Sequence, residues 1–142
     1  MTSENGLKAQ ATEMLKAFQS SLVARDFEKW FTLFSADAVV EFPYAPAGYT
    51  QRLAGIEEIR SYMHELFMRM NVLSFSTPEC LVSGDTIVAE YTCDAVMTGT
   101  EMTGTEKPYR QSYISVFHTK DGKITHFKDY WNPMVLLASA QG

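Results

Sequence analysis

The sequence lacks the segments that anchor a protein in a membrane or direct it out of the cell. No stretch approaches the roughly 18 apolar residues that a membrane-spanning helix needs. The N-terminus, MTSENGLKAQ, is polar and has no apolar stretch of signal-peptide length. Cysteine is scarce, and Cys80 and Cys93 are typical of small buried thiols in a reducing compartment. These absences predict a cytoplasmic protein that does not bind a membrane.

The sequence also has no basic run and no arginine-rich helix. Its 12 Lys and Arg residues are outnumbered by 17 Asp and Glu residues, which gives a net charge of −5. A surface that follows the phosphates of a nucleic acid needs clustered positive charge. We therefore expect no nucleic-acid partner.

Motifs for metal, nucleophilic and nucleotide chemistry are missing. His64, His118 and His126 lie at none of the spacings that place two metal ligands on one helix face, and no HExxH or paired CxxC occurs. No GxSxG elbow exists for a serine nucleophile, and GTEMTG (99–104) fits a hairpin loop better than a phosphate loop. We expect no metal and no cofactor. The chemistry that remains is general acid and base catalysis in a pocket.

What the sequence does have is enough apolar material for a single domain spanning residues 1–142. Hydrophobic residues make up 46% of the chain and aromatic residues 13%, which is typical of a globular domain with a core. Helical spacing predicts helices to about Arg25, over a short segment capped by Asp26, and after Gly55. Their expected inward residues are Leu7, Ala11, Met14, Leu15, Phe18 and Leu22; Trp30, Leu33 and Phe34; and Ile56, Ile59, Met63, Leu66, Phe67 and Met70.

Strand patterns dominate the second half of the chain. AVVEF (38–42) predicts one strand, and Pro43, Pro46 and Gly48 then predict a loop that lasts to about residue 55. From residue 73 onward, β-branched and aromatic runs alternate with turn signals, which is typical of an antiparallel meander. Asp121-Gly122, between SYISVFHTK and KITHFKDYW, indicates a two-residue type I′ turn. Helices first and antiparallel strands later make an α+β fold.

Three segments carry a resemblance to a known family: LFSADAVVEFPYAPAG, RLAGIEEIRSYM and PYRQSYISVFHTKDGKITHFKDYW. They resemble the SnoaL-like polyketide cyclases and ketosteroid isomerases of the nuclear transport factor two superfamily, over nearly the whole chain. The resemblance implies a cone of three N-terminal helices packed in a curved, mostly antiparallel sheet around an apolar cavity. It constrains function much less, because this fold carries isomerases, cyclases, dehydratases, epoxide hydrolases and proteins without catalysis.

The resemblance also bears on single residues. The base of the ketosteroid isomerases falls on Phe42, the tyrosine of their oxyanion hole on Phe18, and the partner acid on Ser115. None of these can perform the isomerase role, so that mechanism is unavailable here. In the SnoaL-like cyclases an aspartate on the last strand is the acid/base residue, and Asp129 resembles it.

Strand parity gives a separate argument for Asp129. In HFKDYWNP (126–133), side chains two residues apart share one face of a sheet, so Asp129 points where Phe127 and Trp131 point. A carboxyl group among aromatic rings is desolvated, and its pKa should rise toward neutrality. The alternative is a solvated or salt-bridged aspartate, which is the commoner fate of such a residue. The same alternation makes Tyr113 a candidate partner or, alternatively, a core aromatic.

These arguments predict an acid/base enzyme for a hydrophobic polyketide-, steroid- or terpenoid-like molecule, acting by isomerisation, aldol cyclisation or dehydration. The alternative is a non-catalytic protein that binds small molecules in the same cavity. A homodimer is expected through the outer sheet face, while Arg52 is a candidate gate and the roles of Glu41 and His64 stay open. The candidate catalytic residues are Asp129 and Tyr113, and the candidate substrate-binding residues are Phe18, Phe34, Phe42, Met63, Gln111, Ser115, Phe127 and Trp131.

Overall fold

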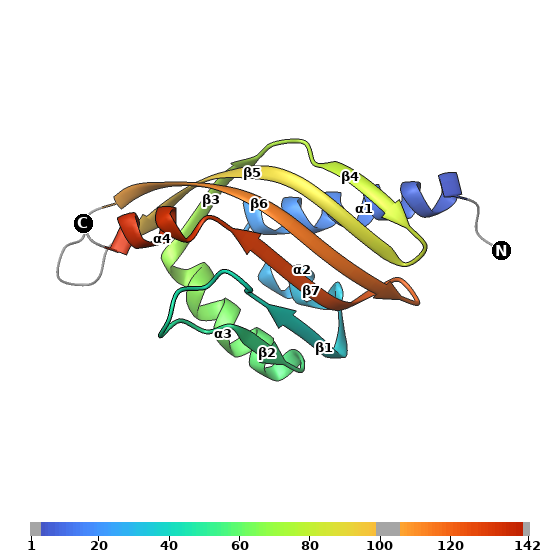
Figure 1. Ribbon diagram of the computed structural model, residues 1–142, viewed down its shortest axis with the longest axis horizontal. Coiled ribbons are helices and arrows are strands. Elements are labelled where there is room, and N and C mark those ends of the chain that lie inside the picture. The colour runs from blue at the N-terminus through green and yellow to red at the C-terminus, as the bar shows by residue number, and fades with distance from the viewer. Residues whose placement is uncertain (1–3, 99–105, 141–142) are drawn as a thin grey trace.

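The computed structural model describes residues 4–98 and 106–140 and has the predicted α+β fold (Figure 1). Within these residues, seven strands form one curved sheet in the order β2-β1-β7-β6-β5-β3, and β4 also pairs with β5. The elements are α1 (Glu4–Val23), α2 (Phe27–Thr32), β1 (Phe34–Glu41), β2 (Arg52–Ala54), α3 (Ile56–Arg69), β3 (Met70–Phe75), β4 (Glu79–Ser83), β5 (Thr86–Thr98), β6 (Glu106–Lys120), β7 (Lys123–Trp131) and α4 (Pro133–Ala140).

The predicted cone is confirmed by the arrangement of these elements. The sheet curves around α1, α2 and α3, and β5, β6 and β7 run across it as long neighbouring strands (Figure 1). Every pairing among the described strands is antiparallel except that of β1 with β7, which is parallel. The sheet is therefore mixed, and β7 lies between β1 and β6.

The hairpin between β6 and β7 has the predicted turn. Asp121 has a φ of 52° and Gly122 a φ of 78°, so both central residues take the positive φ that a type I′ turn requires. Beside the turn Thr119 pairs with Ile124, and a register shift of one residue between His118 and Thr119 then places Ser115 opposite Asp129 across the two strands. The segment 99–104, predicted as a hairpin loop, lies outside the described residues. β5 ends before it and β6 begins after it.

The second helix is shorter than predicted, and this moves Phe34. Asp26 caps α2 by accepting a hydrogen bond from the Lys29 amide at 3.2 Å, but the helix ends at Thr32. Phe34 then opens β1, where it pairs with Ile124 of β7. The prediction that Phe34 lies on a helix face is wrong, because strand pairing takes over the segment four residues before AVVEF begins.

Two further elements were not predicted. The loop after β1 contains the short strand β2, whose Leu53 pairs with Val40. After β7 the apolar run PMVLLASA forms α4, and the Asn132 side chain caps it by accepting a hydrogen bond from the Met134 amide at 3.0 Å. An asparagine followed by Pro133 is a typical helix start, so the sequence did contain a signal for α4.

The core beneath the sheet is built largely from aromatic rings. Phe117 and Phe127 stack with their centroids 4.9 Å apart, and Phe18 contacts both edge-on at 5.3 Å. Trp30, which is 1% exposed, packs on Phe67 of α3 with a centroid separation of 5.1 Å. These contacts join the helices to the inner face of β6 and β7 and leave a cavity above them.

Candidate active site

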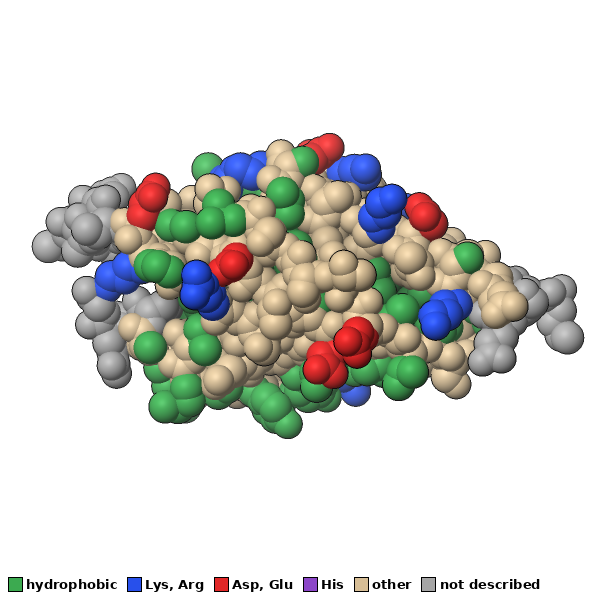
Figure 2. Space-filling model, turned by 90° about the horizontal axis from the view of Figure 1, so that it is seen from above, with side chains coloured by type: hydrophobic (Ala, Val, Ile, Leu, Met, Phe, Trp, Pro, Cys, Tyr) green, Lys and Arg blue, Asp and Glu red, His purple; other side chains and the backbone are tan. Residues whose placement is uncertain are grey.

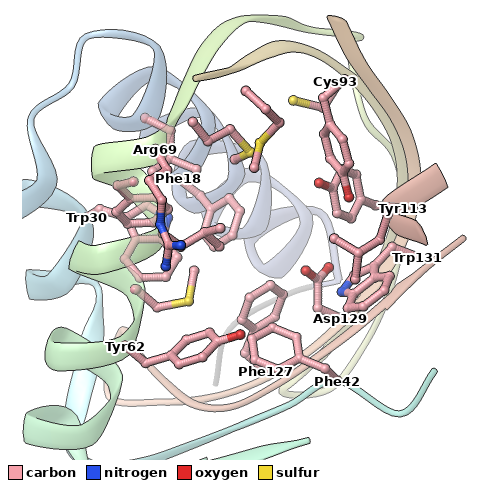
Figure 3. A pocket seen from close by; sticks show the side chains of 18 of the residues that line it. Phe18, Trp30, Phe42, Tyr62, Arg69, Cys93, Tyr113, Phe127, Asp129 and Trp131 are labelled. Carbon is pink, nitrogen blue, oxygen red and sulfur yellow. The ribbon is translucent and has the colours of Figure 1, made fainter. Parts of the chain in front are cut away.

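A cavity of about 340 Å³ lies between the three helices and the inner face of the sheet (Figure 3). This volume is within the range of small-molecule sites in proteins. Its walls are mainly aromatic and aliphatic, and side chains come from α1, α2 and α3 on one side and from β5, β6 and β7 on the other. The labelled lining residues are Phe18, Trp30, Phe42, Tyr62, Arg69, Cys93, Tyr113, Phe127, Asp129 and Trp131.

Asp129 points into this cavity between Phe127 and Trp131, on the face that strand parity indicates (Figure 3). Asp129 is only 9% exposed to solvent. The Ser115 hydroxyl donates a hydrogen bond to Asp129 Oδ1 at 3.0 Å, and Ser115 in turn shares a 2.7 Å hydrogen bond with the Tyr91 hydroxyl. Among the described residues no salt bridge holds the Asp129 carboxyl group.

Burial controls the ionisation of this carboxyl group. Removal of water raises the pKa of Asp129 from its ordinary value of 3.8 to about 7, while the hydrogen bond from Ser115 acts in the opposite direction. Both the acid and the carboxylate are therefore populated near neutral pH. A group in this state can accept a proton and give it back at similar cost.

Three tyrosines from neighbouring strands surround Asp129. Tyr91 and Tyr113 stack with centroids 5.3 Å apart, and Tyr109 also lines the cavity. Burial, and next the negative charge of Asp129, raise the pKa values of Tyr91 and Tyr113 well above the ordinary value. Burial likewise raises the pKa of Tyr109. These phenols therefore stay protonated. Since the one Ser115 proton goes to Asp129, the Tyr91 hydroxyl donates to Ser115, which leaves Tyr109 and Tyr113 to donate hydrogen bonds to an oxygen of a bound molecule.

Most of the candidate site residues lie at the cavity, but three have other positions. Phe34 does not line the cavity, because its ring is packed in the core against Trp30 and Phe127, with centroids 4.7 and 6.2 Å away. Ser115 is fully buried behind Asp129. The cavity is lined by the candidates Phe18, Phe42, Met63, Tyr113, Phe127, Asp129 and Trp131.

Gln111 is the third residue with a different position, since it holds the start of α4 instead of facing a ligand. Its Oε1 accepts hydrogen bonds from the amides of Ser112 and Asn132 at 3.0 and 2.9 Å. Its Nε2 donates to the Asn132 carbonyl at 2.9 Å and to the Tyr109 hydroxyl at 3.0 Å. Strand parity correctly indicated that the Gln111 side chain points inward. It could not show that Asn132, before α4, takes up its hydrogen bonds.

Sequence reasoning missed several lining residues. Tyr62 and Arg69 face the cavity from α3 (Figure 3). Leu136 of the unpredicted α4 also lines it. Tyr91 had the right parity on β5 and could have been found by the argument used for Tyr113. Arg69 carried no signal beyond its place in the last turn of a helix.

Arg52 is not a gate of the cavity. It lies on β2 and its Nε is 3.9 Å from Glu41, which also forms a 2.9 Å contact with His126 Nε2. These side chains occupy the opposite face of the sheet from Asp129, as the alternation of Glu41 and His126 predicts. His64 is exposed on α3 and does not line the cavity.

No three His, Cys, Asp or Glu side chains are grouped as metal ligands anywhere in residues 4–98 and 106–140. None of the helices in that part of the chain is long and apolar enough to cross a membrane.

Comparison with known proteins agrees with this architecture. Residues 11–127 match the family described as the SnoaL-like domain. The uncharacterized protein YesE of Bacillus subtilis is 39% identical over 129 residues, which are 89% of this chain and 84% of YesE. A crystal structure from Bacillus subtilis, provisionally named an isomerase, superposes with a TM-score of 0.84 at 38% identity and 94% coverage of both chains. The fold is shared with a structure from Xanthomonas campestris provisionally named a polyketide cyclase, with a TM-score of 0.77, 18% identity and coverage of 92% and 96%.

Proposed function

Because the chain belongs to the SnoaL-like domain family, and its cavity presents a buried carboxyl group, we propose that it is an acid/base enzyme for a hydrophobic small molecule. The substrate class is polyketide-, steroid- or terpenoid-like, and the reaction is an isomerisation, an aldol cyclisation or a dehydration. One observation carries the proposal. Asp129 is the one acid among the described residues that line the cavity, and its pKa of about 7 suits proton transfer at neutral pH.

The proposed chemistry starts with proton transfer to Asp129. In its ionised form the carboxylate takes a proton from a carbon next to a carbonyl group, and the negative charge moves to the carbonyl oxygen. The protonated Tyr113, and next to it Tyr109, are suited to donate hydrogen bonds to that oxygen. Asp129 then returns the proton to another atom of the substrate, and all three reaction types can follow from this step.

Hydrogen exchange tests the proposal without knowledge of the natural substrate. 2-Tetralone and 5-androstene-3,17-dione are incubated with the protein in D₂O, and deuterium uptake next to the carbonyl group is followed by mass spectrometry. We expect uptake above the rate in buffer, and Asp129→Asn should lower it by a factor on the order of 10². Asp94→Asn is the matched control, since Asp94 lies on the outer face of β5 and pairs with Arg110.

The same assay distinguishes the rival function. Phe18, Phe42 and Ser115 stand where the resemblance places the isomerase residues, and this favours a protein that binds without catalysis. Calorimetric binding of either ketone with no deuterium uptake above buffer would contradict the enzyme and support the binding protein.

We also propose that the protein forms a homodimer through the outer face of the sheet. Ile114 on β6 is 46% exposed and Leu81 on β4 is 77% exposed, and none of the helices in the described part of the chain covers either side chain. Tyr44 and Tyr130 add aromatic surface, with their rings 5.2 Å apart. Figure 2 shows hydrophobic side chains gathered along one long edge of the molecule, while few of them appear in the middle of that view. An apolar sheet face without covering helices favours association with a second copy.

A further inference from the structure

The cavity has its opening and its floor at different residues. Among the lining residues only Tyr49, which is 40% exposed, and Arg69 belong to the exposed surface. Asp129 is buried, as are its neighbours Ser115 and Phe127. The exposed lining residues therefore place the mouth of the cavity beside Tyr49 and Arg69, while Asp129 lies among the buried lining residues.

Arg69 presents its guanidinium group to the cavity from the helix side, across from the Asp129 carboxyl group (Figure 3). Its side chain takes part in no ion pair and no hydrogen bond within the described part of the chain. Every other arginine has such a partner: Arg25 on Phe67 and Met70 carbonyls, Arg52 on Glu41, Arg60 on Glu28 and Arg110 on Asp94.

A structural role explains why an arginine stands at position 69, but not why its side chain faces the cavity. A cation in the last turn of α3 is favourable because the helix dipole is negative there. That interaction places no demand on the direction of the side chain, and Glu65, one turn earlier, does not pair with it. A guanidinium at the mouth of an apolar cavity can donate two parallel hydrogen bonds to a carboxylate.

We propose that Arg69 binds a carboxylate group of the substrate, which makes the substrate an apolar carboxylic acid whose charged end stays at the mouth. The inference rests on the proposed role of Asp129 for the other end of the molecule. Ionised Asp129 repels a carboxylate from the floor while Arg69 attracts it at the mouth, so only one orientation is favourable. The apolar body then lies between Phe18, Phe42 and Trp131, and a carbon remote from the carboxylate reaches Asp129.

A series of phenylalkanoic acids and their methyl esters tests this inference. Binding of phenylacetate through 8-phenyloctanoate, and of each matching ester, is measured by calorimetry at low ionic strength. We expect the protein to bind the acid more tightly than the ester at the best chain length, and added salt to reduce this preference. Arg69→Gln should weaken acid binding roughly threefold to tenfold and leave ester binding unchanged.

Two variants separate this result from other causes. Arg52→Gln removes the same charge from the outer face and should leave both affinities unchanged. Asp129→Asn should keep the preference for the acid even if turnover is lost, so a failure of the proposed catalysis does not imitate a failure of this inference. Equal binding of acid and ester, no binding of any acid, or an Arg69→Gln protein with unchanged preference would each overturn it.

Discussion

Ser115 and Asp129 face each other across the β6–β7 ladder, and the Ser115 hydroxyl donates a 3.0 Å hydrogen bond to the Asp129 carboxyl group. Tyr91 extends this contact to β5 through its 2.7 Å hydrogen bond with Ser115. The state of the proposed catalytic acid therefore depends on two side chains that lie behind it.

Replacing Ser115 should change the pH dependence of activity. The hydrogen bond from Ser115 lowers the pKa of Asp129, so Ser115→Ala should raise that pKa above about 7. The pH midpoint of ketone deuterium uptake should then move upward. Ser112→Ala, on the outer face of the same strand, should leave the midpoint where it is in the unchanged protein. A midpoint that stays fixed in Ser115→Ala would remove Ser115 from the proposed site.

Protein stability should fall as pH rises from about 4 to 7. In this window the unfolded chain has already lost the Asp129 proton, because the ordinary pKa is 3.8, while the folded chain keeps it until about pH 7. The folded state binds more protons, so the free energy of unfolding decreases with pH, by ~2–4 kcal/mol in total.

Asp129→Asn should remove this decrease, because asparagine stays neutral at every pH. In urea unfolding, the free energy of unfolding of the variant should rise relative to that of the unsubstituted protein between pH 5 and pH 8. Asp94→Asn again serves as the control. Parallel pH profiles for Asp129→Asn and the unchanged protein would mean that Asp129 is ionised when folded throughout this range.

Gln111 should matter for stability rather than for ligand binding. Its amide group makes buried hydrogen bonds to Tyr109 and Asn132, so Gln111→Ala leaves several polar groups without partners. We expect a loss of about 1–3 kcal/mol in the free energy of unfolding. Gln51→Ala removes one 3.3 Å hydrogen bond of a side chain at the surface and should cost far less. Equal losses in the two variants would contradict the role given to Gln111.

The proposed dimer predicts a variant that separates the subunits. Ile114→Lys places a charge on the exposed apolar face of β6 and should convert a dimer to a monomer in sedimentation velocity at micromolar concentration. Thr12→Lys, on the exposed side of α1, should leave the mass unchanged. A monomer in the unsubstituted protein would rule out the dimer before any variant is made.

The inward direction of Asp129 was predictable because it needs only strand parity with Phe127 and Trp131, whereas its pairing with Ser115 also depends on the register shift between His118 and Thr119. Phe34 was misplaced because its apolar character suits a helix face and a strand equally, and pairing with Ile124 decided between them. Arg69 and Leu136 could not be predicted, since their approach to the cavity depends on how α3 and α4 meet the sheet. Local patterns thus indicated the floor of the site but not its mouth.

The position of β7 inside the sheet has a consequence for how this protein can diversify. β7 has a partner strand on both sides, so the backbone that carries Asp129 cannot move without breaking two ladders. The mouth instead depends on one helix end and the loop that holds Tyr49, which have fewer such restraints. Substitutions at the mouth can therefore alter which molecules enter while the reacting group keeps its place, so new substrates are accessible to this chain without a new catalytic strand.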